Sequence, residues 1–301
     1  MVAYILISGG IETKNKQLQK QTVAVALTES TSTIPFPIAN TRVIEPFTYL
    51  NLTSKGVIVY DIDNDKVIFS QGKDNILPIA SITKLMTIFT ASKFLSPETE
   101  ITITQEDIDQ AGDSDLAANE RWSFKNLTAF TLITSSNIGA TAIARKVKEV
   151  SGLNFVSEMN NSANEMGLTN SLFRNSTGLD LSNHQISGAN STAQDIAYLY
   201  AYLLENKPEL LTDTNKSHIS ISSLDGNAHI ANNTNDIINQ ITGIIASKTG
   251  TTQMAGGNLS IVFNPLPNRR IAIVILGDTP TGRFVDMRKL IKDTVQTIKN
   301  Q

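Results

Sequence analysis

The chain has 301 residues, of which 41% are hydrophobic and 18% are charged, and its formal net charge is −3. Length and composition are typical of a globular protein with one large domain or two. The charge balance argues against binding of nucleic acid and against a polybasic patch that binds membranes. Because the chain has no cysteine and only three, widely separated histidines, we expect no disulfide, no thiol nucleophile, no metal site and no cofactor.

The first 44 residues are expected to precede the folded domain. Residues 2–7 are apolar, but this run is shorter than the ~20 residues that span a bilayer, and it lacks the charged region and cleavage site of a complete signal peptide. It fits the tail of a truncated membrane anchor or a short strand, and we favour the anchor. Residues 13–40 are rich in Thr, Ser, Gln and Lys, which is typical of a linker. One domain is therefore expected over residues 45–301.

Two short runs of β-branched and aromatic residues predict a hairpin near the start of this domain. They are residues 56–60 and 66–69, and the Asp- and Asn-rich segment between them is typical of a turn. Pro78 then interrupts the chain. Residues 81–95 predict a helix, because their apolar side chains recur at helical spacing.

The middle of the chain, about residues 96–224, is expected to form a helical subdomain. Helical spacing of apolar residues recurs in the segments 127–133, 138–150, 155–166 and 192–204. Strands are expected over 244–247, 259–263 and 271–276, and a final helix over 283–299. Strands at both ends most simply share one antiparallel sheet, with the helical part inserted between them. The expected fold class is therefore α/β in the α+β sense.

Three short motifs carry the groups that acyl transfer needs. They are Ser81-Ile82-Thr83-Lys84, Ser135-Ser136-Asn137 and Lys248-Thr249-Gly250. Together they supply a hydroxyl nucleophile, an amine to take its proton, a second hydroxyl with an amide, and a second cation. Such a set can perform acyl transfer without His, Cys or a metal.

Each motif alone is weak, because the first two occur twice, and only the local settings separate the copies. The motif at Ser81 opens an amphipathic helix, whereas its copy at Ser70 follows a strand and predicts a polar turn. The motif at Ser135 lies at a break between predicted helices, where side chains can point into a cleft. Its copy at Ser162 lies within a predicted helix, and we expect it on the solvated face.

Lys84 can activate Ser81 only when its amine is neutral, and a free lysine has a pKa of ~10.4. A base working near pH 7 to 8 needs a pKa lower by about 3 units, or roughly 4 kcal/mol against the ammonium form. We expect burial and the charge of Lys248 to act in that direction. Lys248 and Thr249 on a strand can bind a substrate carboxylate, and Gly250 lets the substrate backbone approach.

The chain resembles the D-alanyl-D-alanine carboxypeptidases among the low-molecular-mass penicillin-binding proteins, the peptidase S11 family. Besides the three motifs, the resemblance rests on residues 78–87, 155–180, 191–197 and 248–256, and it runs from about residue 56 to 290. It implies a beta-lactamase/transpeptidase-like fold: an antiparallel sheet flanked by helices, with an inserted all-helical subdomain and the active site in the cleft between them.

The resemblance also implies the ligands and the location. The substrate would be a peptidoglycan stem peptide ending in D-Ala-D-Ala, and beta-lactam antibiotics would be covalent inhibitors. Because peptidoglycan lies outside the cytoplasmic membrane, the protein would be extracytoplasmic, on the periplasmic or cell-wall face, and membrane-anchored or secreted.

The resemblance further implies a role for each residue of the first two motifs. Ser81 would form the acyl-enzyme, and Lys84 would be its base. Ser135 would relay the proton to the departing D-alanine. Asn137 would bind the peptide group of the substrate.

The third motif and its surroundings would bind the substrate's end. Lys248 and Thr249 would hold the terminal carboxylate beside Gly250, and Arg283 would aid its recognition. The backbone N–H groups of Ser81 and Thr251 would form the oxyanion hole.

The sequence departs from the family pattern after Asn137. Members usually carry Asp at the next position, but here Ile138 and Gly139 follow. The β-rich C-terminal domain of many members also has no counterpart in the printed sequence.

Three other functions were weighed. A D,D-endopeptidase that cuts cross-links would use the same residues, and the sequence does not separate it from a carboxypeptidase. A class A beta-lactamase adds a glutamate for deacylation, and Glu165 is the nearest candidate. A non-enzymatic binding module is disfavoured, because every nucleophilic and proton-transfer group is present.

Overall fold

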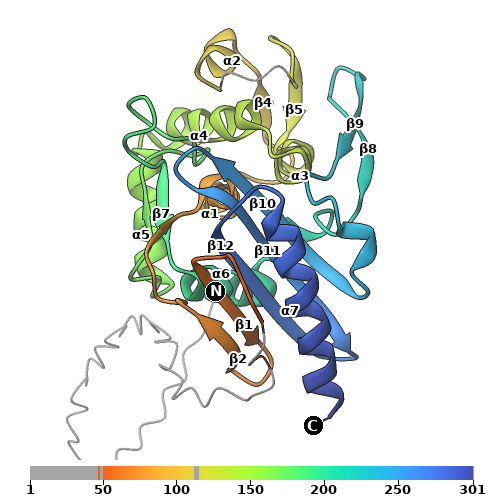
Figure 1. Cartoon of the computed structure of the whole chain (residues 1–301). Coiled ribbons are helices and arrows are strands. Elements are labelled where there is room, and N and C mark those ends of the chain that lie inside the picture. Colours follow the sequence, from red (N-terminus) through yellow and green to blue (C-terminus); the bar gives the residue numbers. More distant parts are fainter. Residues whose placement is uncertain (1–46, 48–49, 112–114, 301) are drawn as a thin grey trace, which may run out of the picture. The chain divides into compact units, whose positions relative to one another are not determined.

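A five-stranded antiparallel sheet contains strands from both ends of the described chain. A computed structural model describes residues 47, 50–111 and 115–300, so the expectation for residues 1–44 lies outside the described residues. The strand order is β10 (Ile244–Thr252), β11 (Gly256–Leu266), β12 (Arg269–Asp278), β1 (Gly56–Asp61) and β2 (Lys66–Gln71) (Figure 1). The predicted shared sheet is confirmed, and its C-terminal strands are longer than predicted.

Both faces of this sheet are buried. Successive side chains of a strand point to opposite faces, so neighbouring residues pack into different cores. On β12, Val274 belongs to the larger hydrophobic core and Ile273 to a second core. Residues of α6 (Ala193–Asn206) join the larger core, and residues of α7 (Gly282–Lys299) join the second. Helices therefore cover the sheet on both sides, as the fold class implies.

The segment inserted between β2 and β10 is mainly helical, as predicted. Besides α6, its helices are α1 (Thr83–Ala91), α2 (Gln105–Ala111), α3 (Phe124–Thr134), α4 (Asn137–Ser151) and α5 (Phe155–Glu165). Side chains of Ser123, Ser136 and Asn154 cap α3, α4 and α5 by accepting a hydrogen bond from the N–H three residues later. Such caps fix where each helix begins.

The same segment contains short elements that the periodicity did not predict. The strands are β3 (Leu77–Pro78), β4 (Glu100–Thr102), β5 (Arg121–Ser123), β6 (Leu172–Phe173), β7 (Ala189–Ser191), β8 (His218–Ser222) and β9 (Ala228–Asn232). The 3-10 turns are η2 (Ala80–Ile82), η3 (Pro208–Leu211) and η4 (Ile238–Gln240). Most of these elements are too short for apolar periodicity to identify them, whereas β8 and β9, with five residues each, are long enough but were not predicted.

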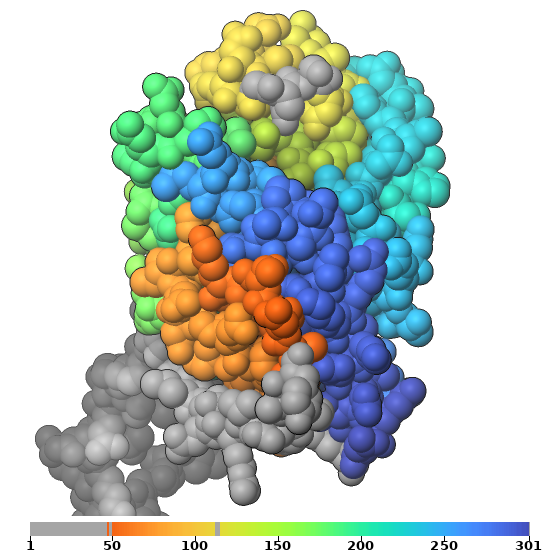
Figure 2. Space-filling view, in the orientation of Figure 1, coloured from red at the N-terminus to blue at the C-terminus, as the bar shows by residue number. Residues whose placement is uncertain are grey.

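The segment that leads into β1 lies beside α7 on one face of the domain (Figure 2). The two ends of a domain are often adjacent in this way. Across residues 50–111 and 115–300, no helix has both the length and the apolar character needed to cross a bilayer.

Candidate active site

Ser81 lies in the 3-10 turn η2, directly before α1, and not in the first turn of an α-helix as predicted. Ala80 has a φ of +48°, a left-handed value that is uncommon for a residue with a Cβ. The Thr83 hydroxyl donates to the Ala80 carbonyl over 2.6 Å and so holds the turn. Strained backbone of this kind is often found at functional sites.

Lys84 is fully buried directly behind Ser81. Its Nζ lies 2.8 Å from Ser81 Oγ, 2.7 Å from Asn137 Oδ1 and 2.9 Å from the carbonyl oxygen of Thr177. The first contact joins the predicted nucleophile to the predicted base. This is the geometry that activation of a serine hydroxyl requires.

The second motif forms the junction between α3 and α4, where a helix break was predicted. Ser135 follows α3 in a left-handed conformation with a φ of +65°. Ser136 caps α4, and Asn137 is the first residue of that helix. The Ser135 hydroxyl accepts a hydrogen bond from Nζ of Lys248 over 2.8 Å. The junction thus provides a hydrogen-bond acceptor to each of the two lysines: Asn137 to Lys84 and Ser135 to Lys248.

The third motif lies on β10, the edge strand of the sheet. Lys248 is buried, and this burial, together with the positive charges of Lys84 and Arg283, holds its pKa well below its ordinary value. Its Nζ also donates to the Thr249 carbonyl over 2.9 Å. The Thr249 hydroxyl lies 2.5 Å from that of Thr234. Both side chains predicted to bind a carboxylate are thereby fixed in place.

Gly250 lets β10 pass directly against the turn that carries the nucleophile. A Cβ at this position would lie 2.6 Å from the Ile79 carbonyl oxygen and 3.1 Å from the backbone nitrogen of Ser81. A larger residue would therefore push the strand away from Ser81. Glycine brings β10, and with it the exposed Thr251, up to the nucleophile.

Arg283, in the first turn of α7, lies behind β10. Its Nη1 donates to the Gly250 carbonyl over 2.9 Å, to the Thr251 hydroxyl over 2.7 Å and to the Asn258 carbonyl over 3.1 Å. Its guanidinium also lies 4.6 Å from the ring centroid of Phe284. The charge is therefore held beneath the strand, where it orients the Thr251 hydroxyl.

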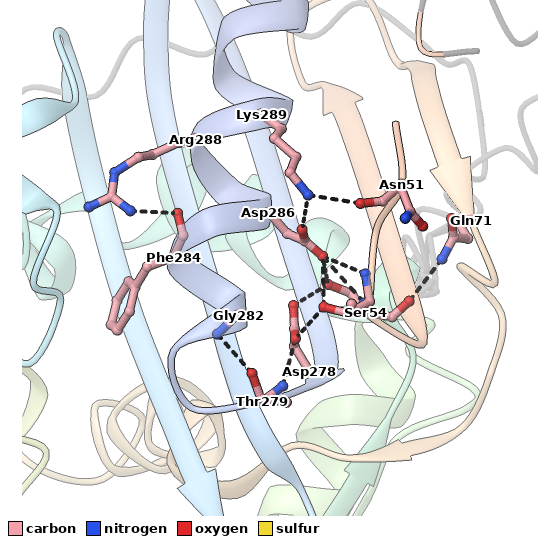
Figure 3. Close-up of polar contacts among 11 residues, drawn as sticks. Asn51, Ser54, Gln71, Asp278, Thr279, Gly282, Phe284, Asp286, Arg288 and Lys289 are labelled. Atoms are coloured by element: carbon pink, nitrogen blue, oxygen red, sulfur yellow. Dashed lines mark hydrogen bonds and ion pairs between the residues drawn. The ribbon is translucent and has the colours of Figure 1, made fainter. Parts of the chain in front are cut away.

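Two buried carboxylates, Asp286 on α7 and Asp278 at the end of β12, hold the segment before β1 (Figure 3). Asp286 accepts hydrogen bonds from the Thr53 N–H over 2.8 Å and from the Ser54 hydroxyl over 3.0 Å. Asp278 lies 2.7 Å from the same hydroxyl, and Lys289 donates to Asp286 over 2.9 Å. Burial acts to raise the pKa of Asp286, but these hydrogen bonds and the Lys289 charge hold it below its ordinary value.

The duplicate motifs lie in other surroundings. Lys73, in the copy that begins at Ser70, binds Asp74 and Gln194. Ser162 was expected on a solvated helix face, but it is fully buried in α5. The apolar packing of that helix against the larger core extends around the serine, which its spacing did not indicate.

Glu165, the candidate for a lactamase-type glutamate, lies at the end of α5. Its side chain is 63% exposed and forms an ion pair with Lys93 over 2.7 Å. A deacylating glutamate must reach a water beside the acyl group. This exposed pairing gives no support to a class A beta-lactamase.

Three groups at the site were not singled out from the sequence. They are the Thr177 carbonyl, the Thr234 hydroxyl and the Asp180 carboxylate, which contact Lys84, Thr249 and Thr252, respectively. The Asn-x-x-Gly pattern that begins at Asn175 is typical of a turn and could have marked the first. The others are brought in by long-range packing and leave no local signal.

Ile138 stands where members of the family usually carry Asp, and its surroundings are apolar. Its side chain is fully buried in the larger core. At the next residue, Gly139, a Cβ would lie 2.1 Å from Thr131 Oγ1. A carboxylate at residue 138 would be buried among apolar groups, so an isoleucine suits this packing better.

The site therefore combines the Ser81 hydroxyl, the buried amines of Lys84 and Lys248, and the Asn137 amide. Among residues 47, 50–111 and 115–300, no group of His, Cys, Asp and Glu side chains could hold a metal ion. The arrangement provides a nucleophile, a base and cationic groups for an anionic substrate, which together suit acyl transfer.

Comparison with known proteins agrees with this geometry. Residues 40–279 match the model of the Peptidase_S11 family, D-alanyl-D-alanine carboxypeptidase. A D-alanyl-D-alanine endopeptidase of Haemophilus influenzae is 31% identical over 236 residues, which cover 76% of this chain and 77% of that protein. The D-alanyl-D-alanine carboxypeptidase DacF of Bacillus subtilis is 28% identical over 245 residues, which cover 79% of this chain and 61% of that protein.

Solved structures show the same fold. Penicillin-binding protein D2 from Listeria monocytogenes, in its ampicillin-bound form, is 27% identical with a TM-score of 0.69, covering 82% of this chain and 98% of that chain. A mutant of the Streptomyces K15 DD-transpeptidase matches with a TM-score of 0.71 at 18% identity, covering 82% of this chain and 99% of that chain. The chain belongs to the peptidase S11 family of D-alanyl-D-alanine carboxypeptidases.

Proposed function

We propose that this S11 chain removes the terminal D-alanine of peptidoglycan stem peptides through an acyl-enzyme on Ser81. The observation that carries the proposal is the 2.8 Å hydrogen bond between Ser81 Oγ and the buried amine of Lys84. A serine hydroxyl is a weak nucleophile until a neighbouring base takes its proton. Lys84 supplies that base directly beneath the nucleophile.

In the acylation step, the neutral amine of Lys84 takes the proton as Ser81 Oγ attacks the carbonyl of the penultimate D-alanine. The backbone N–H groups of Ser81 and Thr251 stabilise the oxyanion by ~3–4 kcal/mol per donor. The C–N bond then breaks as the departing amine takes the proton of the Ser135 hydroxyl, and Ser135 regains a proton from the Lys84 ammonium, which becomes neutral again. Lys248 holds Ser135 in place by a hydrogen bond. Water finally hydrolyses the ester on Ser81, so that one amide and one water yield an acid and free D-alanine.

The terminal carboxylate is held by Lys248 and Thr249. A bound anion offsets the repulsion among the basic groups that lowers the pKa of Lys248. Arg283 adds its charge and orients the hydroxyl of Thr251. Asn137, whose Oδ1 is fixed on Lys84, binds the peptide group of the substrate.

Beta-lactam antibiotics are proposed as covalent inhibitors of the same serine. The Listeria protein that this chain resembles has been solved in ampicillin-bound and cefotaxime-bound forms. A lactam carbonyl beside a carboxylate offers Ser81 and Lys248 the same groups as D-Ala-D-Ala. A covalent adduct on Ser81 would show that this serine carries out the acylation step.

Labelling with a fluorescent penicillin tests the assignment. We expect the parent protein to be labelled on Ser81, as located by peptide mass spectrometry, and we expect labelling of Ser81→Ala to fall below detection. Ser70→Ala is the matched control, because it changes the duplicate motif and should label fully. Labelling retained by Ser81→Ala would refute the assignment, and tight peptide binding without D-alanine release would instead support a binding module.

D,D-endopeptidase activity is a second candidate, because the Haemophilus relative carries that name. The same residues would cut the D-alanyl bond of a cross-link. Product analysis on disaccharide-peptide monomers and dimers separates the two. Free D-alanine from monomers supports the carboxypeptidase, and conversion of dimers to monomers supports the endopeptidase.

We also propose an extracytoplasmic location, because peptidoglycan lies outside the cytoplasmic membrane. The catalytic domain is proposed to span residues 45–301. Protease accessibility of the full chain in intact and lysed cells tests the location. If the cell wall and any outer membrane are removed and the cytoplasmic membrane is left intact, resistance of the chain to added protease would contradict this location.

A further inference from the structure

The direction of the Lys84 lone pair is set partly by a group outside the three motifs. A neutral amine has two N–H bonds and one lone pair, and it takes the Ser81 proton only when that lone pair faces the hydroxyl. The Thr177 carbonyl and Asn137 Oδ1 can only accept hydrogen bonds from this amine, over 2.9 and 2.7 Å. When they take the two N–H bonds, the lone pair is left to the Ser81 hydroxyl.

The Asn175 side chain fixes the peptide group to which this carbonyl belongs. Asn175 Oδ1 accepts a hydrogen bond from the Gly178 N–H over 2.7 Å. A peptide group is planar, with its N–H and C=O pointing in opposite directions. Because the Gly178 N–H points to Asn175, the Thr177 carbonyl of the same peptide group points away from it and towards Lys84. Asn175 Nδ2 completes the clamp by donating to the Leu179 carbonyl over 2.8 Å.

The loop has little room to compensate for a lost clamp. Gly178 has a φ of +82°, and a Cβ there would lie 2.0 Å from the Ala80 carbonyl oxygen. The Thr87 hydroxyl donates to the Ser176 carbonyl over 2.6 Å. The loop is therefore pressed against the nucleophile's turn, and a rotation of the 177–178 peptide group would move its carbonyl relative to Lys84.

We propose that Asn175 is a positioning residue, which rests on the proposed function of Ser81 and Lys84. It orients the 177–178 peptide group, so that the Thr177 carbonyl directs the lone pair of Lys84 at Ser81. Turning that carbonyl away has two effects. The lone pair is no longer aimed, so acylation slows. The ammonium form also loses a stabilising dipole, so the acidic limb of the rate profile moves to lower pH.

The test is the second-order rate of acylation by fluorescent penicillin between about pH 5 and pH 10. For Asn175→Ala we expect a rate roughly 10- to 100-fold lower, as misplacement of catalytic groups typically causes, with the limb at lower pH. Asn175→Asp keeps the acceptor for the Gly178 N–H but loses the donor to the Leu179 carbonyl, so its rate should lie between those of the parent and Asn175→Ala, while its negative charge moves the limb to higher pH. Lys248, the basic group whose charge is coupled to that of Lys84, is unchanged in both variants.

Asn160→Ala is the matched control. The Asn160 side chain clamps backbone groups of Val156 and Phe173 at the start of the same segment. We expect a lower thermal midpoint for this variant but no movement of the limb. An unchanged profile in Asn175→Ala, or the same change in Asn160→Ala, would overturn the positioning role. Absence of a Ser81 adduct in the parent protein would instead refute the proposed function.

Discussion

Lys248 is a charged residue placed where the fold disfavours its charge. Its Nζ has hydrogen bonds to Ser135 Oγ and the Thr249 carbonyl, yet burial and the charges of Lys84 and Arg283 hold its pKa well below the ordinary value. An unfolded lysine, with a pKa of ~10.4, binds its proton more tightly. Between the folded and unfolded pKa values, unfolding therefore takes up a proton, and stability rises with pH.

The variant Lys248→Met removes this titration. We expect the free energy of unfolding of the parent protein to rise relative to the variant as the pH approaches ~10, by at most about 1.4 kcal/mol per pH unit. Urea unfolding at a series of pH values measures the difference. Lys216→Met, which changes a lysine with a 53% exposed side chain, is the control and should follow the parent. Parallel curves for the parent and Lys248→Met would contradict the lowered pKa.

Helix α7 contributes to the site through the way its first turns are anchored. Asp286 and Asp278 both contact the Ser54 hydroxyl, and the Thr53 N–H and Lys289 add further hydrogen bonds to Asp286 (Figure 3). The pKa of Asp286 is held below its ordinary value, so its stabilising contribution is complete above about pH 4. That contribution is lost as the pH falls through the lowered folded pKa.

Asp286→Asn tests this anchor. Near neutral pH we expect the variant to be less stable than the parent by roughly 1–3 kcal/mol, because buried donors lose a charged acceptor. The gap should close as the pH falls through the lowered folded pKa of Asp286, where the parent's carboxyl group also becomes protonated. Asp293→Asn, on the same helix, is the control. Chemical unfolding at a series of pH values decides, and a gap that persists unchanged in acid would count against the anchor.

Elements with long periodic patterns could be predicted from the sequence, and those fixed by distant contacts could not. The helix over 283–299 has a clear apolar stripe, and α7 matches it closely. The turn at Ser81 was predicted as α-helix, because nothing local shows that Gly178 and Gly250 press against Ala80 and its neighbours. Strand β8 was missed because its residues were assigned to the helical region over 96–224, and β9 lies in a stretch, 225–239, for which no element was predicted.

The whole molecule brings together parts that are far apart in the sequence. The sheet takes strands from both ends of the described chain, and the inserted helices carry the first two motifs (Figure 1). Motif order and the family resemblance predicted that Ser81, Lys84 and Lys248 share one site, and the structure places them close together. The turn at Asn175 has a local signal, but the contact of its Thr177 carbonyl with Lys84 and that of the Thr234 hydroxyl with Thr249 could not be predicted, because they form only when these segments pack against α1 and β10.

Activation of Ser81 by a neutral Lys84 can be observed directly. An NMR titration of the full chain with 13C-labelled lysine follows the ε-carbon of Lys84, which is assigned by its loss in Lys84→Arg. We expect this signal to titrate with the same midpoint as the acidic limb of acylation by fluorescent penicillin. A Lys84 that remains ammonium throughout the pH range in which acylation is fastest would contradict the mechanism.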